Sequence, residues 1–177
     1  MRFRQIKELV SWAADYHARL ADKYTRLAAE GSDERVRMAL HYLAEHERKL
    51  EADLVGYLDD GTDHRNVLDA WFDDPNDFPH APVLERLPKD VDGESVQSVL
   101  ATALTAHRTL QDLYAHRADL AGGSDERAFF EALSVAMKPR YVVSLATCND
   151  WKIIEEVPCR ISCSPQDAGL LDAGSIA

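Results

Sequence analysis

The sequence lacks any uninterrupted apolar run of the roughly 20 residues needed to cross a bilayer. Its first eight residues, Met1-Arg-Phe-Arg-Gln-Ile-Lys-Glu8, are positively charged but have no apolar run behind them, and more charges follow at Asp15 and Arg19. We therefore expect neither a signal peptide nor a membrane-spanning segment. The expected location is the cytoplasm, with no membrane partner.

Basic residues are also in short supply. The chain has 20 Lys and Arg against 31 Asp and Glu, for a net charge of -11. Phosphate groups are bound by basic surfaces, so this balance argues against nucleic acid or an anionic membrane as a partner. Apolar residues make up 46% of the 177 residues, which excludes a disordered protein and is enough for one domain with a sizeable core.

Cysteine is scarce and confined to the end of the chain, at Cys148, Cys159 and Cys163. Three residues separate Cys159 from Cys163, not the two of a usual zinc knuckle. We interpret the three as free thiols, with redox sensing through Cys159 and Cys163 as an alternative. The sequence also has no glycine-rich phosphate loop, no nucleophile elbow and no EF-hand spacing.

What the sequence does contain is a helical pattern that repeats about ninety residues later, with a histidine at the centre of each copy. Steps of three and four place residues on one face of an α-helix, so each histidine lies within an apolar stripe. A buried imidazole needs a hydrogen-bonding partner. The two stripes are Ile6, Val10, Ala13, His17, Leu20, Tyr24 and Leu27, and then Val96, Leu100, Ala103, His107, Leu110, Tyr114 and Arg117.

Four long helices are predicted, over about 4–30, 33–58, 93–121 and 125–150. The first should end in a left-handed turn at Gly31, and Ser32 and Ser124 should open the second and fourth. Pro139 should kink the fourth helix. A short amphipathic piece at 66–72 should pack Leu68, Trp71 and Phe72 onto the bundle.

The lengths of the connections predict the topology. Tight turns join the first helix to the second and the third to the fourth, so each pair should be an antiparallel hairpin. Residues 61–92 are long enough to cross a helix of about 40 Å, so the second and third helices can run parallel. The expected fold is all-α: a four-helix bundle over 1–151 with a crossover at 61–92, followed by an irregular tail at 152–177.

With this topology the chain resembles the ferritin-like superfamily, nearest the rubrerythrin type, over roughly residues 4–150. The resemblance rests on the duplicated hairpin, the crossover, and the phrases Lys23-Tyr-Thr-Arg-Leu-Ala-Ala-Glu-Gly31 and Leu43-Ala-Glu-His-Glu-Arg-Lys-Leu-Glu51. It implies a ferritin-like bundle that holds two iron ions. In that family the first helix of each hairpin brings a glutamate seven residues before a tyrosine, and the second helix brings a Glu-x-x-His pair.

This chain departs from the family pattern at most ligand positions. A di-iron carboxylate site of the usual kind is therefore not encoded, and ferroxidase or peroxidase chemistry does not carry over. His17 and His107 stand where glutamates are expected, Leu50 replaces the first ligand histidine, and the second Glu-x-x-His falls at Lys138, Pro139 or Arg140.

Three polar residues remain at central stripe positions: His17, Glu47 and His107. Two histidines and one carboxylate are a known ligand set for a single divalent metal with open positions, and Fe(II), Zn(II) or Mn(II) would suit it. Tyr24 and Tyr114, two turns further on, are expected to hydrogen-bond to these ligands.

The same residues also fit a hydrogen-bond network without metal. Glu47 would accept from one or both imidazoles, and Arg140 would neutralise it. His46 with Glu47 is an alternative ligand pair, although a solvated flank is the preferred interpretation of His46.

Our first interpretation is a divergent ferritin-like bundle that has lost the usual di-iron centre and has a binding or structural role, as a homodimer. The alternative is a metal-dependent oxidoreductase with one metal on His17, Glu47 and His107. The sequence identifies no substrate and no small-molecule ligand.

Overall fold

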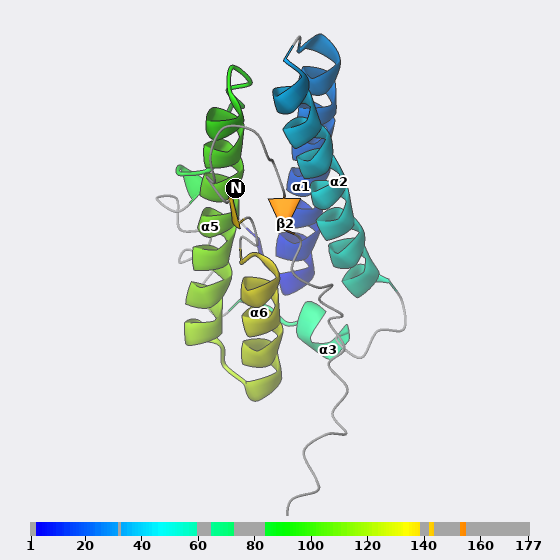
Figure 1. The fold of residues 1–177 in the computed structure, drawn as a ribbon. Coiled ribbons are helices and arrows are strands. Elements are labelled where there is room, and N and C mark those ends of the chain that lie inside the picture. The colour runs from blue at the N-terminus through cyan, green and yellow to red at the C-terminus, as the bar shows by residue number, and fades with distance from the viewer. Residues whose placement is uncertain are drawn as a thin grey trace, which may run out of the picture. The chain divides into compact units, whose positions relative to one another are not determined.

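The computed structural model describes residues 3–31, 33–59, 65–72 and 84–138, together with the pairs 142–143 and 153–154. The chain divides into two compact units, residues 1–139 and 140–177. In the first unit the described elements are the helices α1 (Ile6–Glu30), α2 (Glu34–Leu58), α3 (Arg65–Leu68), α5 (Val96–Leu120) and α6 (Ser124–Ala136) (Figure 1). In the second, β1 (Val142–Val143) and β2 (Ile153–Ile154) form a short antiparallel pair. The chain is mostly helical, as the expected all-α class requires.

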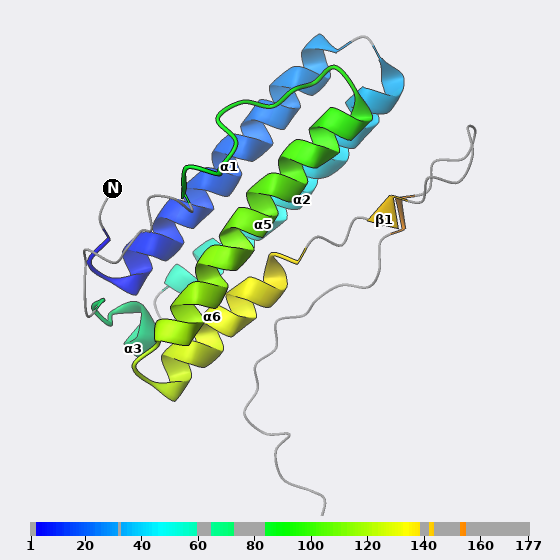
Figure 2. The ribbon, with the colours of Figure 1, turned by 90° about the vertical axis from the view of Figure 1, so that its left-hand side faces the viewer.

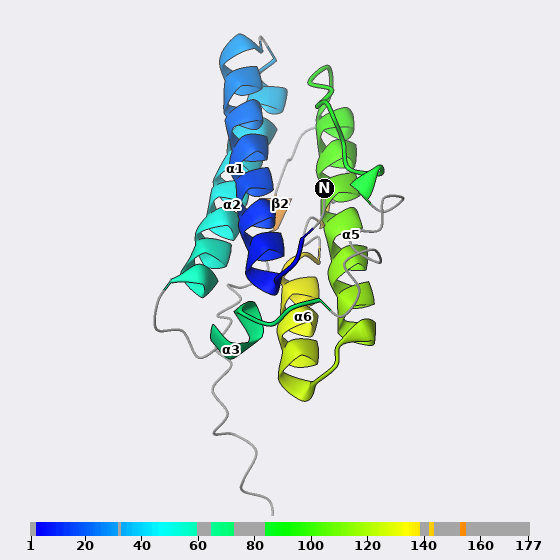
Figure 3. The same cartoon turned by 180° about the vertical axis from the view of Figure 1, so that it is seen from behind.

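The helices of the first unit form two hairpins. Helices α1 and α2 run antiparallel, as do α5 and α6, and α2 and α5 run in the same direction (Figures 1 and 2). The segment that leads into α5 lies along the bundle, where Asp90 pairs with Lys23 of α1 and Arg86 with Asp112 of α5, the latter at 3.0 Å. This crossover returns the chain to the end at which α5 begins (Figure 3). No helix within the described part has both the length and the apolarity to cross a membrane.

The turn between α1 and α2 differs in detail from the prediction. Gly31 has a φ of -74° and a ψ of 139°, so it is extended and not left-handed. The N-cap of α2 is Asp33, whose carboxylate accepts from the backbone N–H groups of Arg35 and Val36 at 2.8 and 3.0 Å. Ser32, the expected cap, lies outside the described residues. Aspartate is as good a cap as serine, and one position further on it meets the same orphan donors.

The fourth helix is shorter than predicted. Helix α6 ends at Ala136, and residues 142–143 are a strand, so the expectation of a kinked helix to about residue 150 is wrong. Proline lacks the N–H that would continue the ladder, and it disfavours the helical conformation of the residue before it. Pro139 itself lies outside the described residues. The consequence is a bundle whose fourth helix covers only part of the length of the other three (Figure 2).

The crossover packs beside the N-terminus of α1. The backbone N–H of Ile6 donates to the carbonyl of Ala70 at 3.1 Å, and that of Phe72 donates to Arg4 at 3.0 Å. Leu68 and Phe72 are buried, as expected, but Trp71 is 66% exposed. Side chains alternate between the two faces of an extended segment, so burial of Phe72 turns Trp71 outward.

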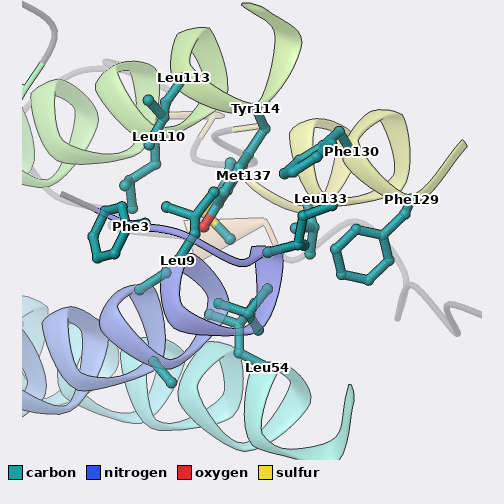
Figure 4. Close-up of a cluster of buried hydrophobic side chains, with 14 of the residues drawn as sticks. Phe3, Leu9, Leu54, Leu110, Leu113, Tyr114, Phe129, Phe130, Leu133 and Met137 are labelled. Carbon is teal, nitrogen blue, oxygen red and sulfur yellow. The ribbon is translucent and has the colours of Figure 1, made fainter. Parts of the chain in front are cut away.

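A large apolar cluster fills the part of the bundle that contains α6. Its side chains come from all four long helices and from α3, and Figure 4 shows how those of α5 and α6 meet those of α1 and α2. Within this cluster the buried guanidinium of Arg117 lies 4.3 Å from the ring centre of Phe72. Labelled members are Phe3, Leu9, Leu54, Leu110, Leu113, Tyr114, Phe129, Phe130, Leu133 and Met137.

Candidate metal centre

Three helices each bring one polar side chain to a single buried point. His17 of α1, Glu47 of α2 and His107 of α5 are at most 1% exposed. The Nδ1 atom of His17 lies 2.6 Å from Oε2 of Glu47, and Nε2 of His107 lies 2.9 Å from Oε1. The two imidazole rings are 6.1 Å apart at an angle of 70°. The structure therefore brings together all three residues that the stripes singled out.

The repeat explains why the three meet at one level. The apolar cluster ends at Ala14 in α1, at Leu50 in α2 and at Leu110 in α5, each three residues from a member of the centre. Three residues are about one turn of helix, so His17, Glu47 and His107 form the next layer of the bundle. This layer lies at the edge of that cluster, and further buried apolar residues, among them Leu20, Leu43 and Ala103, lie beyond it.

The carboxylate of Glu47 carries the charge of this layer. Burial raises its pKa, but the hydrogen bonds from His107 and His17 and the charge of the imidazoles outweigh burial and lower the pKa to about 2. Glu47 is therefore ionised at neutral pH, and both imidazoles donate an N–H to it. No lysine or arginine in the described part of the chain pairs with it, and Arg140, the expected partner, lies outside that part. An ionised carboxylate in this position attracts a cation.

Several buried polar atoms beside this layer have no hydrogen-bond partner among the residues that the structure describes. They are Nε2 of His17 and the hydroxyls of Tyr16 and Tyr24. Burial raises the pKa of both tyrosines far above its ordinary value, and the negative charge of Glu47 raises it further. Both hydroxyls therefore stay protonated and share the environment of Glu47. Buried polar groups without a partner are costly and rare, which indicates that this layer binds a further group, such as an ion or a water molecule.

The hydrogen bonds expected from Tyr24 and Tyr114 are absent. Both side chains are fully buried, but neither hydroxyl has a partner in the described part of the chain. Tyr114 belongs to the apolar cluster, and burial is the only cause that raises its pKa. Each tyrosine lies two turns of helix beyond the histidine of its own stripe. At that separation neither hydroxyl forms a direct hydrogen bond to the centre.

His46 is a residue that the sequence pattern assigned to the solvated flank. Its side chain is only partly exposed, its ring lies 5.4 Å from that of His107, and it stacks on Tyr42 at 6.4 Å. Burial lowers its pKa to about 4, and the charge of His107 adds to this. The spacing of four between Tyr42 and His46 was the available signal, because such residues are neighbours on a helix.

The low pKa of His46 predicts a loss of stability in mild acid. The unfolded chain takes up a proton on His46 below about 6.5 and the folded chain only near 4, so stability is complete above 6.5 and falls between these values. The loss across the window is at most about 3 kcal/mol. Urea unfolding at pH 7 and pH 4.5 should show a smaller difference for His46→Leu than for the exposed control His41→Leu. Equal differences in the two variants would contradict the prediction.

The donor atoms fit one metal ion better than two. One candidate atom from each of the three side chains lies within 4.8 Å of the others. A tetrahedral ion at about 2.1 Å from each donor separates the donors by about 3.4 Å. Binding therefore requires the contact of 2.9 Å to widen by about 0.5 Å and that of 2.6 Å by about 0.8 Å. A di-iron centre does not fit. Two ions need several negative ligands, whereas Leu50 is buried, Lys138 is exposed, and Glu47 is the one buried carboxylate among the described residues.

Other sequence candidates fall outside the described residues, namely Pro139, Arg140, Cys148, Cys159 and Cys163. Nothing in the described part therefore bears on the redox alternative for the cysteines. No protein-family model matches the chain, and comparisons with curated proteins and with solved structures found no match.

Proposed function

We propose that this protein binds one divalent transition-metal ion in its core, on His17, Glu47 and His107. The observation that carries the proposal is the ionised, fully buried carboxylate of Glu47, whose two oxygens each face an imidazole nitrogen and which no lysine or arginine of the described residues pairs with. Two imidazoles and a carboxylate are the donor set of mononuclear Fe(II), Zn(II) and Mn(II) sites. Three protein ligands leave positions open for water or a substrate, so an oxidoreductase activity is the enzymatic form of this proposal.

We also propose that the bundle is a divergent ferritin-like one, of the rubrerythrin type, that has exchanged a di-iron centre for a single-ion centre. In support, the hairpins repeat, α2 and α5 run parallel, and His17 and His107 hold equal places in the two repeats. The replacement of carboxylates by neutral imidazoles lowers the negative charge that two metal ions require.

A second candidate function is a structural hydrogen-bond network without metal. The direct contacts of 2.6 and 2.9 Å favour it, because they are normal lengths for charge-assisted hydrogen bonds. Such a network would specify the packing of α1, α2 and α5 at this level. It leaves the hydroxyl of Tyr24 without a partner among the described residues, which is why we rank it second.

Metal analysis separates the two candidates. Protein purified without chelator, or dialysed against Co(II), Zn(II) or Fe(II), is expected to hold about one ion per chain. His17→Ala and His107→Ala each remove a ligand and should lower the content well below that value. His41→Ala, at an exposed position of α2, is the control and should leave it unchanged. A wild-type protein that holds no ion under any of these conditions would refute the metal proposal and leave the network.

A further inference from the structure

Helix α6 covers one side of the bundle but stops short of the metal centre. Its Phe129 packs edge-on against Tyr57 of α2, with ring centres 5.5 Å apart. His46 precedes Tyr57 by eleven residues, which is three turns, so the two lie on nearly the same face of α2. His46 is about 16 Å from Tyr57 along the axis, whereas α6 extends only about 10 Å beyond Phe129 before it ends at Ala136.

The face of α2 that α6 covers at Tyr57 is therefore free of α6 at His46. At this level His46 is partly exposed, while the three members of the centre are sealed from solvent, with exposures of 0%, 0% and 1%. Its ring contacts that of His107, and Glu47 is its neighbour in the chain. His46 is thus partly open to solvent and at the same time in ring contact with one of the three ligands, His107.

We propose that His46 is a transit ligand, which binds a divalent metal ion at the surface and passes it to His107 and Glu47. The inference rests on the proposed metal function and adds the route by which the ion reaches a closed site. In the first step the hydrated ion exchanges a water for a ring nitrogen of His46. In the second step Nε2 of His107 and an oxygen of Glu47 would replace a second water and His46 on the ion, and the proton of Nε2 would pass to water or, through water, to Nδ1. An imidazole suits this role because it binds such ions through one lone pair and adds no charge that would trap them.

The ring spacing agrees with transfer and not with permanent coordination. The ring of His107, whose centre lies 5.4 Å from that of His46, is close enough for a rotation of the His46 side chain to bring it to an ion on His107. In the arrangement observed, the candidate metal-binding group comprises His17, Glu47 and His107, and His46 is not a member. A transit ligand should therefore change how fast the ion moves and not how much is bound.

Stopped-flow absorbance with Co(II) tests this proposal. The full-length wild type is compared with His46→Leu and with the matched control His41→Leu, which makes the same substitution at an exposed position on another face of α2. We expect His46→Leu to slow both Co(II) uptake and its removal by EDTA by about tenfold or more, with a final content near one ion per chain. The control should match the wild type in both rates. Circular dichroism at neutral pH establishes that each variant is folded.

The outcomes separate the two proposals. Unchanged rates in His46→Leu would overturn the transit role and leave the metal site intact. A folded His46→Leu protein that no longer binds Co(II) would also overturn it, because His46 would then be a permanent ligand. A wild type that binds no Co(II) would overturn the metal function itself, and the transit role with it.

Discussion

Replacement of Glu47 by alanine is expected to lower the free energy of unfolding by about 1–3 kcal/mol. The carboxylate accepts from Nδ1 of His17 and Nε2 of His107, and its loss leaves two buried donors without an acceptor. Urea unfolding at neutral pH measures the change. Glu45→Ala, which removes a carboxylate two residues away on the exposed side of α2, is the control and should cost little. Equal losses in the two variants would show that the centre does not stabilise the fold.

The variant Glu47→Gln distinguishes the acceptor role from the charge. Glutamine keeps one acceptor oxygen at the same place, so it should cost less than alanine if hydrogen bonding is the main contribution. If an ion is bound, divalent metal should raise the unfolding midpoint of the wild type. At a hundredfold excess of metal over the Kd, the free energy of unfolding should rise by about 2.7 kcal/mol. That increase should vanish in Glu47→Ala. A wild type insensitive to metal would favour the structural network.

Exposure of the protein to Fe(II) and air is expected to give no oxo-bridged di-iron absorption and no rapid ferroxidase turnover. Two iron ions a few ångströms apart repel each other and need several negative ligands between them. Glu47 is the one buried carboxylate that the described part of the bundle offers, and the corresponding level of the second hairpin has only His107. The expected product is at most one iron per chain.

Mössbauer spectroscopy of protein loaded with ⁵⁷Fe provides the decisive measurement, with iron content determined on the same sample. A coupled pair of ions in the wild type would show that a further carboxylate joins the centre and would overturn the single-ion assignment. The variant His107→Glu supplies a useful comparison, because it adds a second carboxylate to the centre. An increase above one iron per chain in that variant alone would support the view that missing charge is what limits the site.

The sequence was sufficient for the parts of this protein that depend on local periodicity. Apolar residues at steps of three and four marked the buried faces of α1, α2 and α5, because a helix repeats its faces with this period. The same pattern identified the three members of the centre, since polar residues interrupt a stripe only where they find partners. Connection lengths predicted the two hairpins and the parallel course of α2 and α5.

Local detail near the helix ends was less predictable. Ser32 and Asp33 are both good N-caps, and the choice of Asp33 depends on where the chain enters α2. Helix α6 ends at Ala136. A helix continues through a proline such as Pro139 only if packing in the bundle offsets the lost hydrogen bond, and the pattern of apolar residues does not reveal this.

Only the tertiary structure decided how the buried centre is connected to its surroundings. Periodicity places His46 off the main stripe, and burial of that position follows from the side of α2 that faces His107. Periodicity also does not distinguish the surroundings of the two tyrosines. The hydroxyl of Tyr24 has no partner among the described residues and lies in the environment of Glu47, whereas Tyr114 lies among apolar side chains. The two repeats are alike in sequence, but α6 ends partway along the bundle, so equivalent residues meet different neighbours. A helical stripe specifies which side of a helix is buried, whereas the contacts across helices depend on which other helices reach the same level.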